Sequence, residues 1–176
     1  MALIEIKNVT KTYSTGKNIL SQALDGISMA VESKDFTAIA GPSGSGKSSL
    51  LHLIGALDAP SQGQIFYEGR DITTMTSNAL SDFRRDHIGF VFQAYNLVSA
   101  LTALENVEYI MLLQNIPAHE RRKRAIDALQ RVGLNDYLHR FPQEMSGGQQ
   151  QRVAIARAIA ARPKVVERLT ASKPGA

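Results

Sequence analysis

The stretch GPSGSGKSS, residues 41–49, constrains the fold more than any other part of the sequence. It fits the pattern G-x-x-x-x-G-K-[ST], in which the backbone N–H groups of a glycine-rich loop surround a phosphate chain. A helix should follow such a loop, because its positive N-terminus then faces the same anion. The apolar run DFTAIAG precedes the loop and LLHLIGAL follows it. The sequence therefore predicts a buried strand at 35–41, a phosphate loop and a helix beginning near Lys47.

The motif gives each polar group of the loop a role. Lys47 is expected to reach the outer phosphates, and the hydroxyl of Ser48 to hold Mg²⁺. The alternative is a Gly/Ser loop without function, but the flanking patterns favour a nucleoside triphosphate site. The motif alone does not separate kinases, GTPases and transport ATPases. The other residues expected to line the phosphates are Gly41, Ser43, Gly44, Ser45, Gly46 and Ser49.

Composition limits the class of protein. The chain has 176 residues, of which 44% are hydrophobic and 20% charged, which suits one globular domain and is a little short for two. A net charge of +4 does not by itself indicate nucleic acid. Cysteine is absent, so neither a disulfide framework nor a thiolate metal site is expected. No signal-peptide core opens the sequence and no stretch approaches the ~18 apolar residues of a membrane span, so a membrane role requires a partner.

Alternating and helical patterns divide the chain into an α/β body with a mixed β-sheet and a helical insertion at about 94–145. The basic run from Arg121 to Arg124 is interpreted as a solvated helix face. Val165 and Val166 begin a strand that then breaks off. Strands are expected at 3–9, 26–33, 35–41, 62–72 and 87–93, and helices at 102–114, 119–134 and 146–163.

A second glycine motif, Ser146-Gly147-Gly148-Gln149, stands at the predicted start of the last helix. A serine hydroxyl, glycine amides and a helix dipole together make a second phosphate-binding surface. The alternative is an ordinary serine N-cap, because serine is favoured there in any case. The pairing of this motif with the phosphate loop, about a hundred residues earlier, is far more specific than either motif alone.

With both motifs in place, residues 3–166 resemble the ATP-binding cassette, or ABC, ATPases, which have a P-loop NTPase fold. Tyr13, in NVTKTYSTG, matches the aromatic residue that stacks on adenine; the alternative is an exposed tyrosine beside a strand. Gln93, in GFVFQAYNL, matches the Q-loop glutamine, which contacts Mg²⁺ and the attacking water. Met145 stands where the family often has leucine before its signature motif.

Several sequence segments, such as RRDHIGFVFQAYNLVSALTALENV, are similar to those of ATPases of the lipoprotein-releasing and macrolide-exporter type. That resemblance implies a transmembrane permease partner, docked near residues 94–115, at the cytoplasmic face of the bacterial inner membrane. It also implies a second ATPase copy in a head-to-tail dimer. Ser146 and Gly148 of one copy would bind the γ-phosphate held by Lys47 of the other. No nucleic acid partner is expected.

The end of the sequence departs from the family pattern. The family's catalytic Asp-Glu pair should fall near residues 169 and 170, where the chain has Leu169 and Thr170. Glu167 is close, but a side chain displaced along a strand can point to the opposite face. The family's switch histidine is also unmatched by the four histidines, which are His52, His87, His119 and His139. Whether the chain is an enzyme is therefore uncertain, and we expect deficient hydrolysis.

The same comparison predicts a defect in folding. Residues 1–166 correspond to an incomplete ATPase domain, and residues 167–176 to a tail outside the family pattern that is expected to be disordered. The C-terminal part of the core, including a central strand, is missing from the pattern. We expect exposed strand edges and a chain that is unstable or aggregates.

Two other functions remain open. One is a soluble ABC protein that acts on ribosomes or DNA, although such proteins usually carry two cassettes or a long coiled coil. The other is a nucleotide-binding remnant without catalysis, which the missing Asp-Glu pair favours. The cofactors expected for the family are ATP and Mg²⁺.

Overall fold

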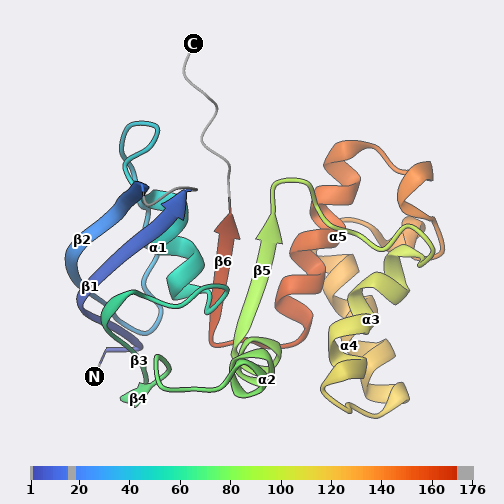
Figure 1. Ribbon diagram of the computed structural model, residues 1–176. Helices are drawn as coiled ribbons and strands as arrows, with labels where there is room; N and C mark the ends of the chain where they lie inside the picture. The colour runs from blue at the N-terminus through green and yellow to red at the C-terminus, as the bar shows by residue number, and fades with distance from the viewer. Residues whose placement is uncertain (1, 16–18, 170–176) are drawn as a thin grey trace. The chain divides into compact units, whose positions relative to one another are not determined.

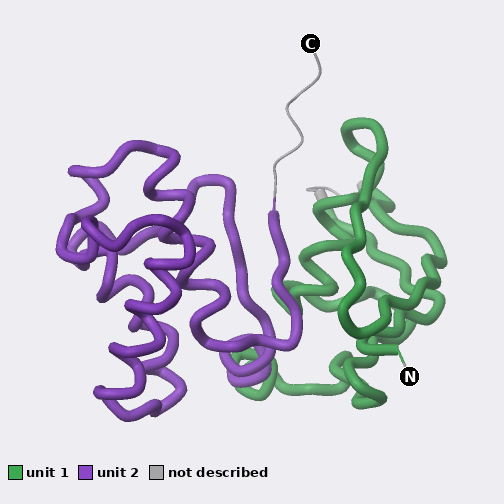
Figure 2. The backbone as a smooth tube through the Cα atoms, turned by 180° about the vertical axis from the view of Figure 1, so that it is seen from behind, with its two compact units in different colours: residues 1–81, 171–176 green, residues 82–170 purple. Residues whose placement is uncertain are grey.

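The computed structural model describes residues 2–15 and 19–169, which form two compact units (Figures 1 and 2). Unit 1 contains the described residues up to Ser81, and unit 2 those from Asp82 onward. Each unit has its own sheet. The predicted α/β class is confirmed, with one antiparallel sheet and one parallel pair in place of a continuous sheet.

Unit 1 is a four-stranded antiparallel sheet in the order β2-β1-β3-β4, with helix α1 beside it (Figure 1). Its strands are β1 (Ile4–Thr15), β2 (Ile19–Val31), β3 (Gln62–Tyr67) and β4 (Arg70–Asp71), and α1 spans Lys47–Ile54. Ile6 of β1 pairs with Met29 and with Ile65, and alternate residues of the sheet are buried. β1 and β2 are longer than predicted because they pair along most of their length.

The predicted buried strand at 35–41 is wrong. These residues have no regular structure, and the side chain of Phe36 is 99% exposed. An apolar segment becomes a strand only where a neighbour accepts and donates its ladder hydrogen bonds. None of the described strands pairs with residues 35–41.

Unit 2 joins the parallel pair β5 (Ile88–Phe92) and β6 (Val165–Leu169) to a set of helices. These are α2 (Ser77–His87), which begins in unit 1, α3 (Ala103–Leu113), α4 (Ala118–Arg131), the 3₁₀ turns η1 (Asn135–Tyr137) and η2 (Pro142–Glu144), and α5 (Gly147–Ala160). α2 was not predicted, because Phe83 is its one buried residue and leaves little apolar periodicity. β6 continues three residues beyond the predicted break at Val166, and the rest of the predicted tail lies outside the described residues.

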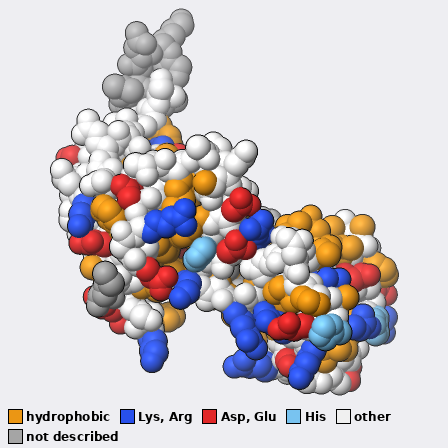
Figure 3. Space-filling view, turned by 90° about the horizontal axis from the view of Figure 1, so that it is seen from below, with side chains coloured by type: hydrophobic (Ala, Val, Ile, Leu, Met, Phe, Trp, Pro, Cys, Tyr) orange, Lys and Arg blue, Asp and Glu red, His pale blue; other side chains and the backbone are white. Residues whose placement is uncertain are grey.

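The basic run on α4 is only partly a solvated face. Arg121 donates to the carbonyl of Ile116 at 3.0 Å and lies 3.9 Å from Glu108 of α3. Arg124 bonds Glu120 one turn earlier. Their three-residue spacing places both arginines on one side of the helix, where they are half-buried. Elsewhere on the surface, basic and acidic side chains are interspersed on the face seen in Figure 3.

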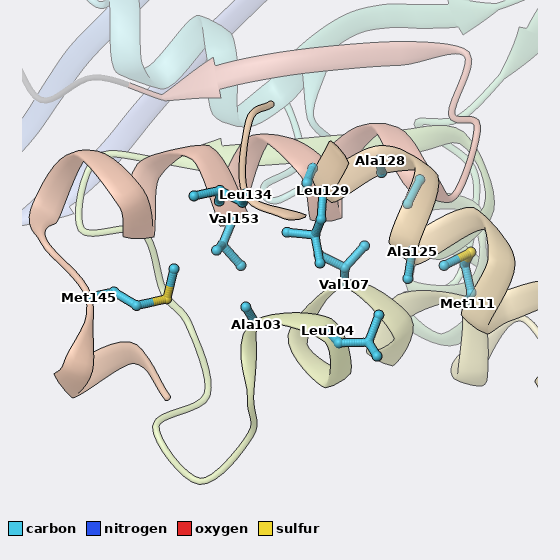
Figure 4. Packing of buried hydrophobic residues seen from close by; sticks show 12 residues of the cluster. Ala103, Leu104, Val107, Met111, Ala125, Ala128, Leu129, Leu134, Met145 and Val153 are labelled. Atoms are coloured by element: carbon cyan, nitrogen blue, oxygen red, sulfur yellow. The ribbon is translucent and has the colours of Figure 1, made fainter. Parts of the chain in front are cut away.

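The core of unit 2 lies between α3, α4 and α5 (Figure 4). α3 begins with a capping box, in which the Thr102 hydroxyl accepts from the N–H of Glu105 and the Glu105 carboxylate accepts from the N–H of Thr102. The side chains that meet in this core are Ala103, Leu104, Val107, Met111, Ala125, Ala128, Leu129, Leu134, Met145 and Val153. No described helix is long and apolar enough to cross a membrane.

Candidate nucleotide-binding site

The phosphate loop ends at the start of α1, as the sequence predicted. Gly46 is the N-cap residue, with φ at +84°, and its backbone packs so closely on the carbonyl of Ala23 that a Cβ would collide with it. No side chain in the described part of the chain caps α1. The first N–H groups of a helix lack partners within the helix, so they can bind an anion here.

Lys47 lies against its own loop. Its ammonium donates to the carbonyl of Pro42 at 2.5 Å and to the hydroxyl of Ser45 at 3.3 Å. The loop itself is exposed, as is Ser48. The geometry therefore places a cation, a hydroxyl and a helix N-terminus together at an accessible surface, which fits a bound triphosphate.

Tyr13 lies on β1 close to this helix. Its hydroxyl donates to Asp58 at 3.2 Å and lies 3.4 Å from the hydroxyl of Ser49. Its side chain is 37% exposed. The structure thus brings together the predicted adenine-stacking residue and a residue of the predicted phosphate site. Lys11 and Asp58, which contact Tyr13, were missed by the sequence reasoning.

The second glycine motif stands at the start of α5. Ser146 is the N-cap: its hydroxyl accepts from the N–H of Gln149 at 3.3 Å, and its own N–H donates to the Gln149 side chain at 2.8 Å. Gly147 and Gly148 are exposed in the first turn. Met145 is buried in the core of unit 2, which explains why an apolar residue precedes the motif. The ordinary N-cap is therefore present, and it also presents the glycine amides to an anion.

Gln93 is exposed in the turn that follows β5. Just after it, the guanidinium of Arg157 on α5 donates to the carbonyls of Tyr95, at 2.7 Å, and Asn96, at 2.6 Å. Burial lowers the pKa of Arg157 from its ordinary value. One signal for this residue was overlooked, namely an arginine within the apolar run AIARAIA.

The last position of β6, close to where the sequence analysis expected an acidic pair, is not acidic. Leu169 occupies the last position of the strand. Glu167 is 5% exposed, neither carboxylate oxygen has a hydrogen-bond partner among the described residues, and burial raises its pKa to about 8. The described residues include no group of three or more His, Asp or Glu side chains that could hold a metal ion. Mg²⁺ would therefore need oxygens from a bound phosphate in addition to the hydroxyl of Ser48.

The predicted site residues form two groups, one in each unit. The first group belongs to unit 1 and consists of Tyr13, Gly41, Ser43, Gly44, Ser45, Gly46, Lys47, Ser48 and Ser49. The second belongs to unit 2 and consists of Gln93, Ser146, Gly147, Gly148 and Gln149.

Comparison with known proteins shows the family of the chain. A family model described as ABC transporter matches residues 24–166. An uncharacterized ABC transporter ATP-binding protein of Thermotoga maritima is 49% identical over 161 residues, which cover 92% of this chain and 68% of that protein. The macrolide export ATP-binding/permease protein MacB of Nitrosomonas europaea is 46% identical over 157 residues, which cover 89% of this chain and 24% of that protein.

A solved structure is also similar. It is the dimeric post-hydrolysis state of the ATP-binding cassette MJ0796, from Methanocaldococcus jannaschii, bound to ADP and Pi. The TM-score is 0.86 at 42% sequence identity, and the match covers 94% of this chain and 72% of that one.

Proposed function

The chain belongs to the ABC transporter family as an ATP-binding subunit, and from this premise we propose that it binds ATP with Mg²⁺ and drives membrane export or lipoprotein release through a permease. The observation that carries the proposal is the exposed phosphate loop at the uncapped start of α1, with Lys47 lying against it. Bound ATP supplies the phosphoanhydride bond whose hydrolysis powers transport. The residues of this chain bind and orient it.

In unit 1, the loop amides and Lys47 neutralise the phosphates, and the hydroxyl of Ser48 is a ligand for Mg²⁺. Tyr13 stacks on the adenine. In unit 2, Ser146 and Gly148 bind the γ-phosphate of a nucleotide held by Lys47 of a second copy, in a head-to-tail dimer. The dimeric structure of the relative MJ0796, bound to ADP and Pi, supports this arrangement.

We place the permease contact on α3 and the segment before it, within residues 94–115. Tyr109, Leu112 and Leu113 follow one another at helical spacing and all three side chains are exposed. Exposed apolar side chains on one helix face are typical of interaction surfaces. Such a contact would hold the chain as a peripheral protein at the cytoplasmic face of the inner membrane.

A non-catalytic nucleotide-binding role is the second candidate, and Leu169 favours it. The position where the family has an acidic side chain at the end of β6 carries an aliphatic one. Glu167 does not replace it, since its carboxyl group is buried and unpaired among the described residues. In this case the chain binds ATP but turns it over very slowly.

ATP affinity of the Lys47→Ala variant tests the shared claim. We expect the affinity to fall at least about tenfold, because a charge-assisted contact with the outer phosphates is lost. Lys123→Ala, which removes an exposed lysine on α4, is the matched control and should bind ATP normally. Equal affinity of the Lys47→Ala variant and the unaltered chain would show that the phosphate loop is assigned wrongly. Turnover in the presence of Mg²⁺ separates the two candidate functions.

A further inference from the structure

Several groups of unit 1 converge on the ring of Tyr13. Lys11 lies two residues earlier on β1, so both side chains project from the same face of the strand. The ammonium of Lys11 lies over the Tyr13 ring, 4.9 Å from its centroid. The Tyr13 hydroxyl is held by Asp58 and lies near Ser49. The ring is therefore fixed both at one face and at its hydroxyl end.

Lys11 is unusual because it is only 9% exposed. Its ammonium donates to the carboxylate of Asp58 and to the carbonyl of Ala59, each at 2.7 Å. Burial pushes the pKa of Asp58 upward, but the bonds from Lys11 and the N–H of Ala59 outweigh it, and the pKa lies below its ordinary value. An ion pair of this kind, with a buried lysine and an aspartate whose side chain is 33% exposed, contributes little net stability compared with apolar residues. Its presence here therefore needs a reason other than stability.

The position of Asp58 supplies that reason. It lies in the turn that follows α1, where its N–H donates to the carbonyl of His52 at 3.2 Å. Ser49 lies in the first turn of the same helix, next to Ser48 of the phosphate loop. Tyr13 is thus connected to both ends of α1. The N–H of Ser61 donates to the carbonyl of Thr10 at 2.8 Å, which adds a second connection between β1 and the segment that follows α1.

We propose that Lys11 and Asp58 are positioning residues that fix the Tyr13 ring relative to the phosphate loop. They thereby set where an adenine base stacks relative to the triphosphate. The inference rests on the proposed nucleotide site. Neither residue touches the nucleotide; both act through Tyr13. Since Lys11 covers one face of the ring, the base stacks on the opposite face.

The test compares ATP with inorganic tripolyphosphate, which has the phosphates but no base. Dissociation constants are measured for the unaltered chain and for Lys11→Met, which keeps an unbranched side chain one atom shorter and removes the charge. We expect ATP affinity to fall about tenfold and tripolyphosphate affinity to stay within about twofold. Asp58→Asn keeps the shape of the carboxylate and should give the same selective loss of ATP affinity. It replaces Lys11→Met in the test if that variant folds poorly.

Lys7→Met is the matched control. Lys7 lies on the same strand, 4.8 Å from the centroid of the Phe66 ring, and pairs with Glu5 at 3.1 Å. Its loss removes the same kinds of contact away from Tyr13, so both affinities should stay unchanged. In a Tyr13→Leu background, Lys11→Met should cause no further loss of ATP affinity, because Lys11 then has no ring to position.

Three results would overturn the inference while leaving the proposed phosphate site in place. The first is an equal loss of ATP and tripolyphosphate affinity in Lys11→Met, which would place its effect on the phosphate loop or the whole fold. The second is a full additional loss in the Tyr13→Leu background. The third is that the unaltered chain binds ATP no more tightly than tripolyphosphate. This result would exclude stacking of the base on Tyr13 but would leave the phosphate site intact. Binding of neither compound would refute the proposed function as well.

Discussion

Replacing Glu167 with leucine should stabilise the chain near neutral pH. The side chain lies on β6 opposite Phe90 of β5, is 5% exposed, and has no hydrogen-bond partner for its carboxyl group among the described residues. Burying an unpaired carboxylate is costly, so the folded chain retains the proton to a higher pH than the unfolded chain does.

The magnitude follows from the two pKa values. Burial raises the pKa of Glu167 from 4.5 to about 8. The folded chain therefore binds more protons than the unfolded chain between these values, and its free energy of unfolding is highest at acidic pH and falls as pH rises through this window. At about 1.4 kcal/mol per pH unit, the loss is about 3 kcal/mol at pH 7. That is a large part of the roughly 5–15 kcal/mol that stabilises a typical domain.

Urea unfolding at pH 5 and pH 7.5, followed by far-UV circular dichroism, measures the effect, since the sequence has no tryptophan to follow. The unaltered chain should lose about 3 kcal/mol between the two pH values. Glu167→Leu should abolish this difference and unfold at higher urea at pH 7.5. Asp58 and Glu105, whose pKa values are lowered, are already ionised at pH 5 and change little over this range.

The control is Asp127→Asn, which removes an exposed carboxylate on α4 of the same unit. It should leave the pH dependence as it is in the unaltered chain. Equal stability of the unaltered chain at the two pH values would refute the reasoning. So would a Glu167→Leu variant that is less stable at pH 7.5, since that would mean the carboxylate makes a favourable interaction when folded.

Three further predictions concern stability and solubility. Leu129→Ala, in the core of unit 2, should cost about 2–5 kcal/mol in urea unfolding, and a loss below about 1 kcal/mol would mean the helices are loosely packed. Arg157→Met should cost about 3 kcal/mol and speed amide hydrogen exchange after β5, because the carbonyls of Tyr95 and Asn96 lose a charged donor; unchanged exchange there would contradict it. Phe36→Lys should reduce light scattering by aggregates without lowering the urea midpoint, because this apolar side chain is 99% exposed. Unaltered scattering would show that residues 35–41 do not cause the aggregation.

The elements that the sequence predicted well are those fixed by nearby residues. The start of α1 at Lys47 depends on Gly46, and the start of α5 depends on the reciprocal bonds between Ser146 and Gln149. A capping residue and its partner lie within four positions of each other, so the pattern that specifies them is visible in a short stretch. The predicted strand at 87–93 was also confirmed, as β5, although its pairing partner β6 is distant in the sequence.

Three of the failures share a different cause, which is dependence on residues outside the local pattern. The run DFTAIAG has the composition of a buried strand, but composition does not supply the neighbour that a ladder requires. Arg121 was interpreted from its charge, although it contacts Glu108 of the neighbouring α3 and the carbonyl of Ile116 in the preceding turn. The Lys11–Asp58 pair joins residues 47 positions apart, and no local pattern indicates it.

The segment before the phosphate loop is not a strand, so other contacts hold the loop in place. These contacts and the residues expected for hydrolysis lie in different units. Gly46 is held from the side by the carbonyl of Ala23 on β2, and α1 is anchored by the buried Leu50 and Leu53. All of these contacts lie within unit 1. The proposed phosphate loop therefore depends on the hairpin and the helix of unit 1, whereas the acidic side chain expected for hydrolysis belongs at the end of a strand in unit 2, where the chain has Leu169. A substitution that weakens β6 should then leave ATP affinity nearly unchanged.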